Sequence, residues 1–437
     1  MPPHPRTAIL NARLLDPDSR LDQRGSLLID GGKIADHGPG LFRDGVPEGV
    51  EVIDADGACV APGLVDLRAQ VGEPGHEDNE TLKTASQAAA AGGVTALACL
   101  PDTDPVIDDV AGLEFIARRA REVRLVKVFA YAGITRDLGG KELTEMGLLA
   151  EAGAVGFTDG GKAVADALVM QRALSYASIW GRPILQHPEE PRLSGSGAMN
   201  SGEIATRLGL SGIPAHSEVI MLERDLRLVE ATGGRYHAAD ISTAESVAVI
   251  RAAKRRGLKI TCDTAPPYFT LTERDVGDYR TFFKLSPPLR GEDDRQAIVE
   301  GLADGTIDCI TSDHLPWNQD AKRVPFAQAA FGSVGLETLL PLTLDLVHKG
   351  HMSLLDALAT VTVKPAAILG LNLGRLRTGA AADLVIFDAE RPWRVDAEAL
   401  HSKSKNSCFD KHPVQGRVLR TLVDGRTVFT LAPARAG

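Results

Sequence analysis

Seven polar side chains mark the places along the chain where chemistry is expected. Each falls at or just after the end of a short run of β-branched and apolar residues, and they are Gln70, Asp102, Asp159, His187, Asp240, Asp263 and Asp313. Carboxylate oxygens and imidazole nitrogens bind divalent cations such as zinc, and both groups also transfer protons. Asp159, His187 and Asp313, with Asp240 as a fourth ligand, could surround one zinc ion. The plainer interpretation is that these residues are structural and are held by hydrogen bonds.

Arg68 argues against a metal ion at this place. If its guanidinium lay about 4 Å from a divalent ion, Coulomb repulsion at an effective dielectric constant of about 20 would cost on the order of 8 kcal/mol. That repulsion would offset most of the roughly 10–16 kcal/mol with which proteins bind structural zinc. We therefore expect no metal, and we predict that Arg68 supplies the positive charge by pairing with some of Asp159, Asp240 and Asp313. A buried cluster of carboxylates needs such a cation.

Eight strand-like runs would position these side chains, and stretches of helical periodicity lie between them. The runs are residues 65–71, 94–100, 125–132, 154–159, 183–187, 235–241, 259–264 and 307–313. Eight strand–helix units in succession are typical of a closed (β/α)8 barrel, whose active sites gather at the carboxyl ends of the strands. This fold would bring the polar side chains to one end of the barrel.

The two ends of the chain differ from this middle part. Both carry alternating strand patterns separated by glycine turns, and neither is long enough to form a domain alone. We predict an α/β protein with a composite β-sandwich domain of residues 1–58 plus 366–437. Residues 59–365 are predicted to form the TIM-like barrel domain beside it.

Composition narrows the functional classes. The 437 residues include 48 Lys and Arg against 58 Asp and Glu, a net charge of −10, which weighs against binding to nucleic acid or to an anionic membrane. No run of 18 apolar residues and no signal-peptide pattern is found in the sequence. The five cysteines are scattered without a Cys-x-x-Cys pair, so we expect a reduced, cytoplasmic protein.

Several longer stretches carry a family resemblance. In chain order they are APGLVDLRAQVGEPG (61–75), ACLPDTDPVID (98–108), GAVGFTDGG (153–161), LQHPEE (185–190), YHAADISTAES (236–246), SPPLRGEDDRQAIVEGLADGTIDCITSDHLP (286–316) and FGSVGLET (331–338). Together they resemble the dihydroorotase family of the amidohydrolase superfamily, in particular its long bacterial type. The resemblance covers nearly the whole chain and implies the same barrel fold.

The resemblance also implies a metal site, from which this chain departs. Active members bind one or two zinc ions that activate a water to attack a cyclic amide, and their first barrel strand ends in Asp-x-His-x-His. The matching residues here are Asp66, Arg68 and Gln70, so both imidazoles are missing. Two positions later the family has an arginine that grips the substrate carboxylate, where this chain has Gly72.

Further positions of the family pattern are changed or kept in the rest of the barrel. A substrate-binding asparagine is matched by Asp102, a histidine ligand by Asp240, and a second asparagine by Ser286. The resemblance would make Asp102 and Ser286 substrate-binding positions only in an active protein. Asp313 matches the carboxylate at the end of the eighth strand that handles the proton, and it would be catalytic under the same condition.

Three other residues have weaker functional interpretations. Asp263 lies at a strand end without a partner that can be named, and His237 matches no ligand position, so both are expected to be structural. Trp317 follows the eighth strand, and its size could allow it to plug the mouth of the pocket.

The chain keeps the residues that build the fold and lacks the metal ligands and the substrate-binding arginine of the family. This combination is typical of a pseudoenzyme. By family resemblance, we expect a catalytically inactive, oligomeric structural partner of aspartate transcarbamoylase in pyrimidine biosynthesis, without a cofactor and without nucleic-acid or membrane partners. The alternative is an active cyclic amidohydrolase. It would run on one zinc ion held by Asp159, His187, Asp240 and Asp313, or on no metal. A third possibility is a small-molecule sensor that kept the pocket.

Overall fold

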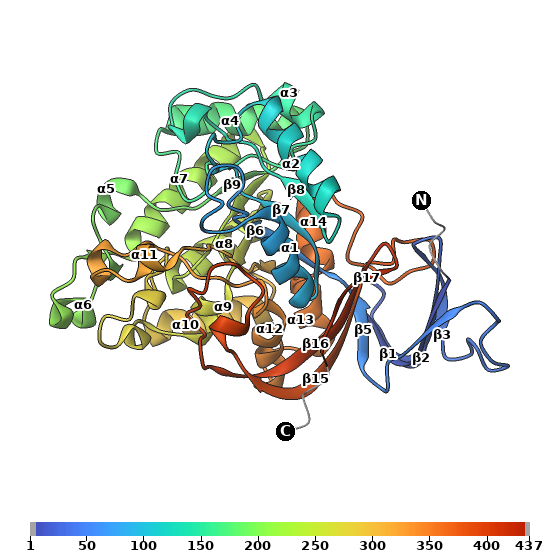
Figure 1. Ribbon diagram of the computed structural model, residues 1–437. Helices are drawn as coiled ribbons and strands as arrows, with labels where there is room; N and C mark the ends of the chain where they lie inside the picture. The colour runs from blue at the N-terminus through green and yellow to red at the C-terminus, as the bar shows by residue number, and fades with distance from the viewer. Residues whose placement is uncertain (1–5, 433–437) are drawn as a thin grey trace.

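The computed structural model describes residues 6–432, and these form a barrel with a sheet beside it (Figure 1). Residues 1–5 and 433–437 of the predicted composite domain lie outside the described part. The barrel strands are parallel and are β6 (Leu64–Ala69), β7 (Val94–Cys99), β8 (Lys127–Ala130), β9 (Ile184–Gln186), β12 (Tyr236–Ala238), β13 (Ile260–Thr264) and β14 (Cys309–Ile310). Isolated bridges close the ring, among them the bridge between Ala69 and His314.

The fourth predicted strand, residues 154–159, is present only as an extended segment. Phe157 bridges Ala132 on one side and Ile184 on the other. The Phe157 N–H donates to the Pro183 carbonyl, and the Phe157 carbonyl accepts from the Leu185 N–H. Gly156 has no room for a Cβ, which would lie 2.9 Å from a Leu185 methyl. The segment therefore completes the ring by hydrogen bonding although its regular pairing is one residue long.

Helices follow the strands and cover the outside of the barrel. They are α1 (Leu82–Ala91), α2 (Val110–Val123), α3 (Met146–Glu151), α4 (Ala167–Ile179), α7 (His216–Thr232), α8 (Ala244–Arg255), α10 (Glu292–Ala303) and α12 (Leu339–His348). Asp109 caps α2 by accepting from the Gly112 N–H, and Thr243 caps α8 by accepting from the Ser246 N–H. Among the helices of residues 6–432, none combines the length and the apolar character that a bilayer span requires.

Short elements lie in the connections between these units. They are α5 (Pro191–Ser194), β10 (Met199–Asn200), α6 (Glu203–Leu208), β11 (Gly212–Ile213), α9 (Pro266–Thr270), α11 (Gln319–Lys322), α13 (Leu354–Thr360) and α14 (Val363–Leu369). In Figure 1, α5, α6 and α11 lie on the same side of the barrel. The connection between α9 and α10 also contains the 3-10 turn Thr281–Phe283.

Both chain ends contribute to one mixed sheet of eight strands. Its members are β1 (Thr7–Asp16), β2 (Leu21–Asp30), β3 (Lys33–Gly38), β4 (Glu51–Asp54), β5 (Cys59–Pro62), β15 (Leu384–Arg394), β16 (Pro413–Val423) and β17 (Arg426–Thr430). The early and late strands meet where β5 pairs antiparallel with β15. Strand β5 lies just past the predicted start of the barrel domain at residue 59, so the sheet extends four residues beyond that boundary.

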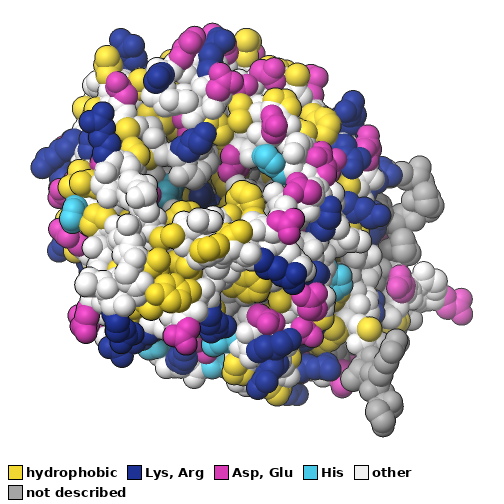
Figure 2. All heavy atoms as spheres, turned by 60° about the vertical axis from the view of Figure 1, so that its left-hand side comes forward, with side chains coloured by type: hydrophobic (Ala, Val, Ile, Leu, Met, Phe, Trp, Pro, Cys, Tyr) yellow, Lys and Arg dark blue, Asp and Glu magenta, His cyan; other side chains and the backbone are white. Residues whose placement is uncertain are grey.

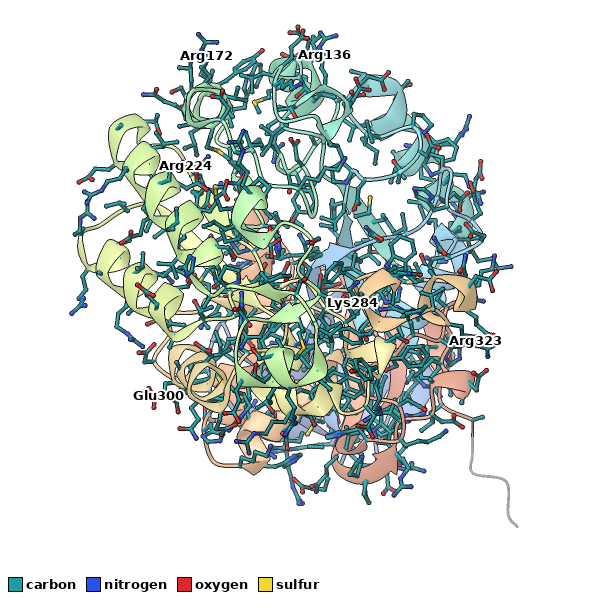
Figure 3. All side chains as sticks on the ribbon, turned by 90° about the vertical axis from the view of Figure 1, so that its left-hand side faces the viewer. Arg136, Arg172, Arg224, Lys284, Glu300 and Arg323 are labelled. Carbon is teal, nitrogen blue, oxygen red and sulfur yellow. The ribbon has the colours of Figure 1, made fainter. Side chains whose placement is uncertain are left out.

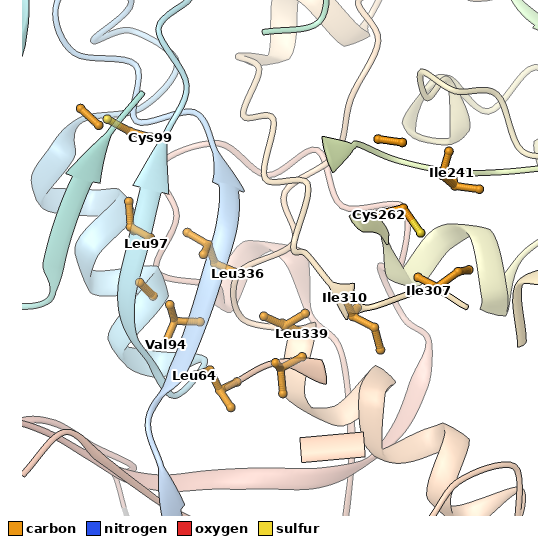
Figure 4. Close-up of a cluster of buried hydrophobic side chains, with 14 of the residues drawn as sticks. Leu64, Val94, Leu97, Cys99, Ile241, Cys262, Ile307, Ile310, Leu336 and Leu339 are labelled. Atoms are coloured by element: carbon orange, nitrogen blue, oxygen red, sulfur yellow. The ribbon is translucent and has the colours of Figure 1, made fainter. Parts of the chain in front are cut away.

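A continuous hydrophobic core joins the barrel to the sheet. Figure 4 shows its barrel part, where Leu64 and Leu97 from β6 and β7 lie in the same cluster as Ile310 from β14. The same cluster of buried residues includes Val385 and Phe387 of β15. The barrel and the terminal sheet therefore share apolar contacts that neither could bury alone.

Candidate active site

Arg68 lies at the carboxyl end of β6 and points at two carboxylates. Its side chain is 6 % exposed, and its Nε lies 2.7 Å from Asp240 Oδ2 and 3.0 Å from Asp313 Oδ1. The contact with Asp313 has the alignment of a hydrogen bond, while the contact with Asp240 is a close ion pair. Asp240 follows β12 and Asp313 follows β14, so three strands deliver the charges to one place.

One guanidinium shared between two buried carboxylates gives them different protonation. Burial alone would raise the pKa of Asp240, but the positive charge of Arg68 and the contact with His187 outweigh it and lower that pKa. Burial and repulsion by Asp240 raise the pKa of Asp313 to about 7 against the opposing effect of Arg68. Asp240 is therefore the ionised member of the pair, while Asp313 titrates near neutral pH.

The backbone at both carboxylates is unusual. Asp240 has φ of 56° and Asp313 has φ of 44°, which is the left-handed region that L-residues other than Asn and Asp rarely adopt. The Asp240 N–H donates to Asp263 Oδ1 at 2.7 Å, which holds this conformation from below. Residues kept in such conformations tend to cluster at functional sites.

His187 and Ser286 stand next to this ion cluster. The His187 Nδ1 lies 3.6 Å from Asp240 Oδ2, and the His187 Nε2 lies 3.3 Å from the Ser286 hydroxyl oxygen. Burial disfavours the charged imidazole, but the contacts with Asp240 and Glu189 outweigh it and raise the pKa of His187. His187 is buried at the end of β9, whereas Ser286 is half-buried.

The predicted ligand Asp159 lies apart from this cluster in its bonding. Its carboxylate accepts from the Thr135 N–H at 3.0 Å and from the Thr135 hydroxyl at 2.5 Å. Burial raises the pKa of Asp159, and these two hydrogen bonds oppose the rise. The structure thus brings Arg68, Asp240 and Asp313 together. The Asp159 carboxylate is hydrogen-bonded to Thr135 instead.

These donors do not fit a zinc ion in this arrangement. Zinc needs ligand atoms at about 2.0–2.2 Å in a tetrahedral shell. The His187 Nδ1 and both Asp240 oxygens make no aligned hydrogen bond within residues 6–432, which leaves them open to a further partner. However, the Arg68 Nε already lies against Asp240 and Asp313, and a second cation among the same oxygens would meet its charge at close range.

A small cavity of about 190 Å³ lies beside other positions at which this chain departs from the dihydroorotase pattern. Its lining residues include Gln70, Gly72, Asp102 and Trp317. The Gln70 amide donates to Asp102 Oδ2 at 2.5 Å. Burial raises the pKa of Asp102. Trp317 lines this cavity while its indole N–H donates to the Phe331 carbonyl at 2.7 Å. Gln70 and Asp102 accordingly give this cavity one polar, acidic wall.

Gly72 cannot be replaced by an arginine without moving this loop. Its φ is +67°, and a Cβ at this position would lie 2.3 Å from the Glu80 carbonyl oxygen. The loop has therefore closed over the place from which a substrate clamp would extend. No lysine or arginine is among the residues that line this cavity.

A second cluster below the site has no counterpart in the sequence-based expectations. The His237 Nε2 lies 2.8 Å from Asp263 Oδ2, and its Nδ1 lies 2.8 Å from the Thr261 hydroxyl. Ligand atoms of His237, Asp263 and Cys309 all lie within 4.8 Å of one another. His237 thus supplies the partner that could not be named for Asp263. The register of the parallel strands explains this contact. His237 pairs with Thr261, and Asp263 lies two residues further along β13, so its side chain is on the same face of the sheet.

Charged groups of both signs are spread over the surface of the molecule (Figure 2). Figure 3 looks along the barrel and shows Lys284 near the middle of the view, while Arg172, Glu300 and Arg323 lie toward its edge. Figure 2 shows Lys and Arg side chains interspersed with Asp and Glu over the face that it presents. This face carries no extended area of one sign.

Comparisons with known proteins agree with this architecture. Residues 57–246 match a family model described as dihydro-orotase-like, and residues 227–429 match one described as the amidohydrolase family. The dihydroorotase of Ehrlichia chaffeensis is 47 % identical over 97 % of this chain and 94 % of its own length. That of a Wolbachia from Brugia malayi is 46 % identical over 97 % and 96 %. Among solved structures, the L-hydantoinase (dihydropyrimidinase) from Arthrobacter aurescens has 26 % identity and a TM-score of 0.86, covering 98 % of this chain and 97 % of its own.

Proposed function

The chain belongs to the dihydroorotase family of the amidohydrolase superfamily, and we propose from this premise that it acts in pyrimidine biosynthesis as a dihydroorotase-like protein. We further propose that Arg68 holds the charge that a metal ion holds in active members, so that the metal-dependent reaction is lost. The observation that carries this proposal is the position of the Arg68 Nε between Asp240 and Asp313. The loop at Gly72, which leaves no room for a substrate clamp, supports it.

A second candidate is an active cyclic amidohydrolase with a rebuilt single-zinc site. The relatives favour it, because proteins that match nearly the whole chain at 44–47 % identity carry the name dihydroorotase. Those names support catalysis better than they support a purely structural function. In this candidate, Arg68 would leave the carboxylates, and Asp159 would exchange its hydrogen bonds with Thr135 for the metal. Asp313, at the end of the eighth strand, would transfer the proton.

Metal content and turnover distinguish the two candidates. The first predicts that the purified wild-type chain, incubated with zinc and desalted, holds far less than one zinc ion per chain and does not hydrolyse dihydroorotate. The double variant R68H/Q70H restores the family pattern after Asp66 and should gain zinc relative to wild type. The single variant Q70H, which keeps Arg68, is the matched control and should not. One zinc ion per wild-type chain together with turnover would establish the second candidate instead.

The proposed partner is aspartate transcarbamoylase, an expectation that rests on the family resemblance alone. The proposal places both proteins in an oligomeric complex in the cytoplasm. All five cysteines are free and buried, which supports a reducing compartment. Sedimentation of a mixture of the two purified proteins should give one species of fixed stoichiometry. Independent sedimentation at micromolar concentrations would contradict the partnership without affecting the expectation about the metal.

A further inference from the structure

A serine hydroxyl, an imidazole and a carboxylate lie side by side in a row at the mouth of the barrel. The Ser286 hydroxyl oxygen lies 3.3 Å from His187 Nε2, and the other ring nitrogen of His187 lies 3.6 Å from Asp240 Oδ2. The three residues come from different parts of the chain: the segment after the 3-10 turn Thr281–Phe283, the end of β9 and the end of β12. A hydroxyl, a base that can take its proton and a carboxylate that orients the base form the arrangement used in nucleophilic catalysis.

The neighbouring residues leave Asp240, His187 and Ser286 in states that such a reaction requires. Arg68 keeps Asp240 ionised, and the hydrogen bond from the Asp240 N–H to Asp263 fixes its backbone. His187 Nδ1 makes no aligned hydrogen bond within residues 6–432, and the carboxylate oxygen Asp240 Oδ2 lies 3.6 Å from that nitrogen. With its proton on Nδ1, the ring presents a lone pair on Nε2 to Ser286. Ser286 is only half-buried, so this residue keeps contact with solvent.

We propose that Ser286 is the nucleophile of a metal-independent acyl-transfer site, with His187 as its general base and Asp240 as the residue that positions His187. The inference deepens the proposed function, because it requires that His187 and Asp240 are free of metal. The substrate class is a small ester or amide with an uncharged acyl group. Asp102, Asp240 and Asp313 disfavour an anionic one, and Arg68 is already paired.

The reaction balances without a further reagent. The Ser286 oxygen forms a bond to the carbonyl carbon of the substrate while the hydroxyl proton moves to His187 Nε2. The bond from that carbon to the alcohol or amine group then breaks, and the leaving group takes the proton from His187. Water next attacks the acyl-Ser286 ester and gives one proton to His187, and the Ser286 oxygen recovers that proton as the acid leaves.

Covalent labelling tests the proposal on the full-length protein in EDTA. A fluorophosphonate probe, which reacts with activated serines, should add once per chain, and peptide mapping should place the adduct on Ser286. The variant S286A should lose the adduct, and H187A should slow labelling at least about 100-fold, the scale of a lost general base. S175A, at an exposed serine on α4, is the control and should label as wild type does. Hydrolysis of p-nitrophenyl acetate should follow the same order.

The positioning function of Asp240 has its own readout. Asp240, Glu189, Arg68 and Asp313 are charged groups that act on His187, and Asp240 raises the pKa of that imidazole. In D240N, the pH at which labelling reaches half its maximum should therefore move lower, whereas a merely structural change would reduce labelling without moving it. Wild-type protein that holds no zinc and gives no adduct on Ser286 would overturn this inference and leave the proposed function intact. Stoichiometric zinc would overturn the proposed function itself.

Discussion

At the residue scale, the electrostatics of the barrel mouth depend on Arg68. Among the residues that the structure describes, it is the one side chain that forms ion pairs with both Asp240 and Asp313, and both carboxylates are buried. Two ionised carboxylates without a counter-ion would repel each other in a medium that solvates them poorly. We therefore propose that the arginine that would oppose zinc also stabilises the folded chain.

Replacing Arg68 by methionine should destabilise the protein strongly. Removing one partner of a buried ion cluster leaves charge uncompensated and typically costs about 3–5 kcal/mol. Urea unfolding of R68M at neutral pH measures the loss. R136M is the matched control, because Arg136 pairs with Glu142 at side-chain exposures of 51 % and 74 %, and such pairs contribute about 1 kcal/mol or less. Equal stability of R68M and wild type would show that Arg68 does not neutralise the carboxylates.

Gly72 gives a second prediction at this scale. Alanine at this position would meet the Glu80 carbonyl oxygen and would also be forced into a left-handed conformation. G72A should therefore lower the melting temperature clearly, and G72R should not create a working substrate clamp. G161A serves as the control, since a Cβ on Gly161 would meet nothing within 4 Å. A G72A protein that melts with wild type would mean that this loop moves easily.

At the scale of elements, the loops over the mouth are tied together by a buried lysine. Lys322, the last residue of α11, is 2 % exposed, and its ammonium donates to the carbonyls of Thr281, Lys284 and Ala330 at 3.2, 3.4 and 2.7 Å. Burial lowers the pKa of Lys322 to about 7. These loops include the segment that carries Ser286, so the lysine helps to set its position.

The lowered pKa of Lys322 makes stability depend on pH. In the unfolded chain the ordinary pKa of about 10.5 applies, so between about pH 7 and 10.5 the unfolded state binds more protons than the folded state. The contribution of this group to stability therefore rises with pH across that window. K322M should lose that rise and should be less stable overall, because three carbonyls lose their donor. Melting temperatures at about pH 7 and pH 9 test this, with exposed Lys349 changed to methionine as the control.

At the scale of the whole molecule, the terminal sheet and the barrel are expected to unfold together. They share one apolar cluster, and Phe387 of β15 is fully buried in it. Truncating a buried phenylalanine to alanine costs about 3–5 kcal/mol through lost transfer energy and a residual cavity. F387A should therefore lower the single melting transition of the entire chain. I179A, at a side chain that is 74 % exposed, should leave it unchanged.

Calorimetry of F387A distinguishes joint unfolding of the sheet and the barrel from independent unfolding. If the two parts were energetically independent, F387A would split the melting curve into an early transition of the sheet and an unchanged transition of the barrel. A single lowered transition in F387A would show that the barrel, including Arg68, draws stability from strands contributed by both chain ends.

The sequence by itself determined the kinds of elements and the chemistry available to them. Alternation and helical periodicity report which face of an element is buried, and that information is local. It predicted the (β/α)8 barrel, which the similarity to hydantoinase structures confirms. It also predicted a β-sandwich built from both ends, where the structure has one mixed sheet of eight strands to which both ends contribute. Residue identity also excluded the His-x-His pair, since Arg68 and Gln70 stand in its place.

Only the tertiary structure decided which of these side chains meet. The direction in which a side chain points and its distance from other side chains depend on how strands from remote parts of the chain are staggered around the barrel. No local sequence pattern encodes that stagger. Asp159 looked equivalent to Asp240 and Asp313 in the sequence, yet Thr135 engages it instead. The contacts of His187 with Ser286 and of His237 with Asp263 span 99 and 26 residues. Such long-range pairs exist only once the ring has closed, because closure fixes which strand ends face one another.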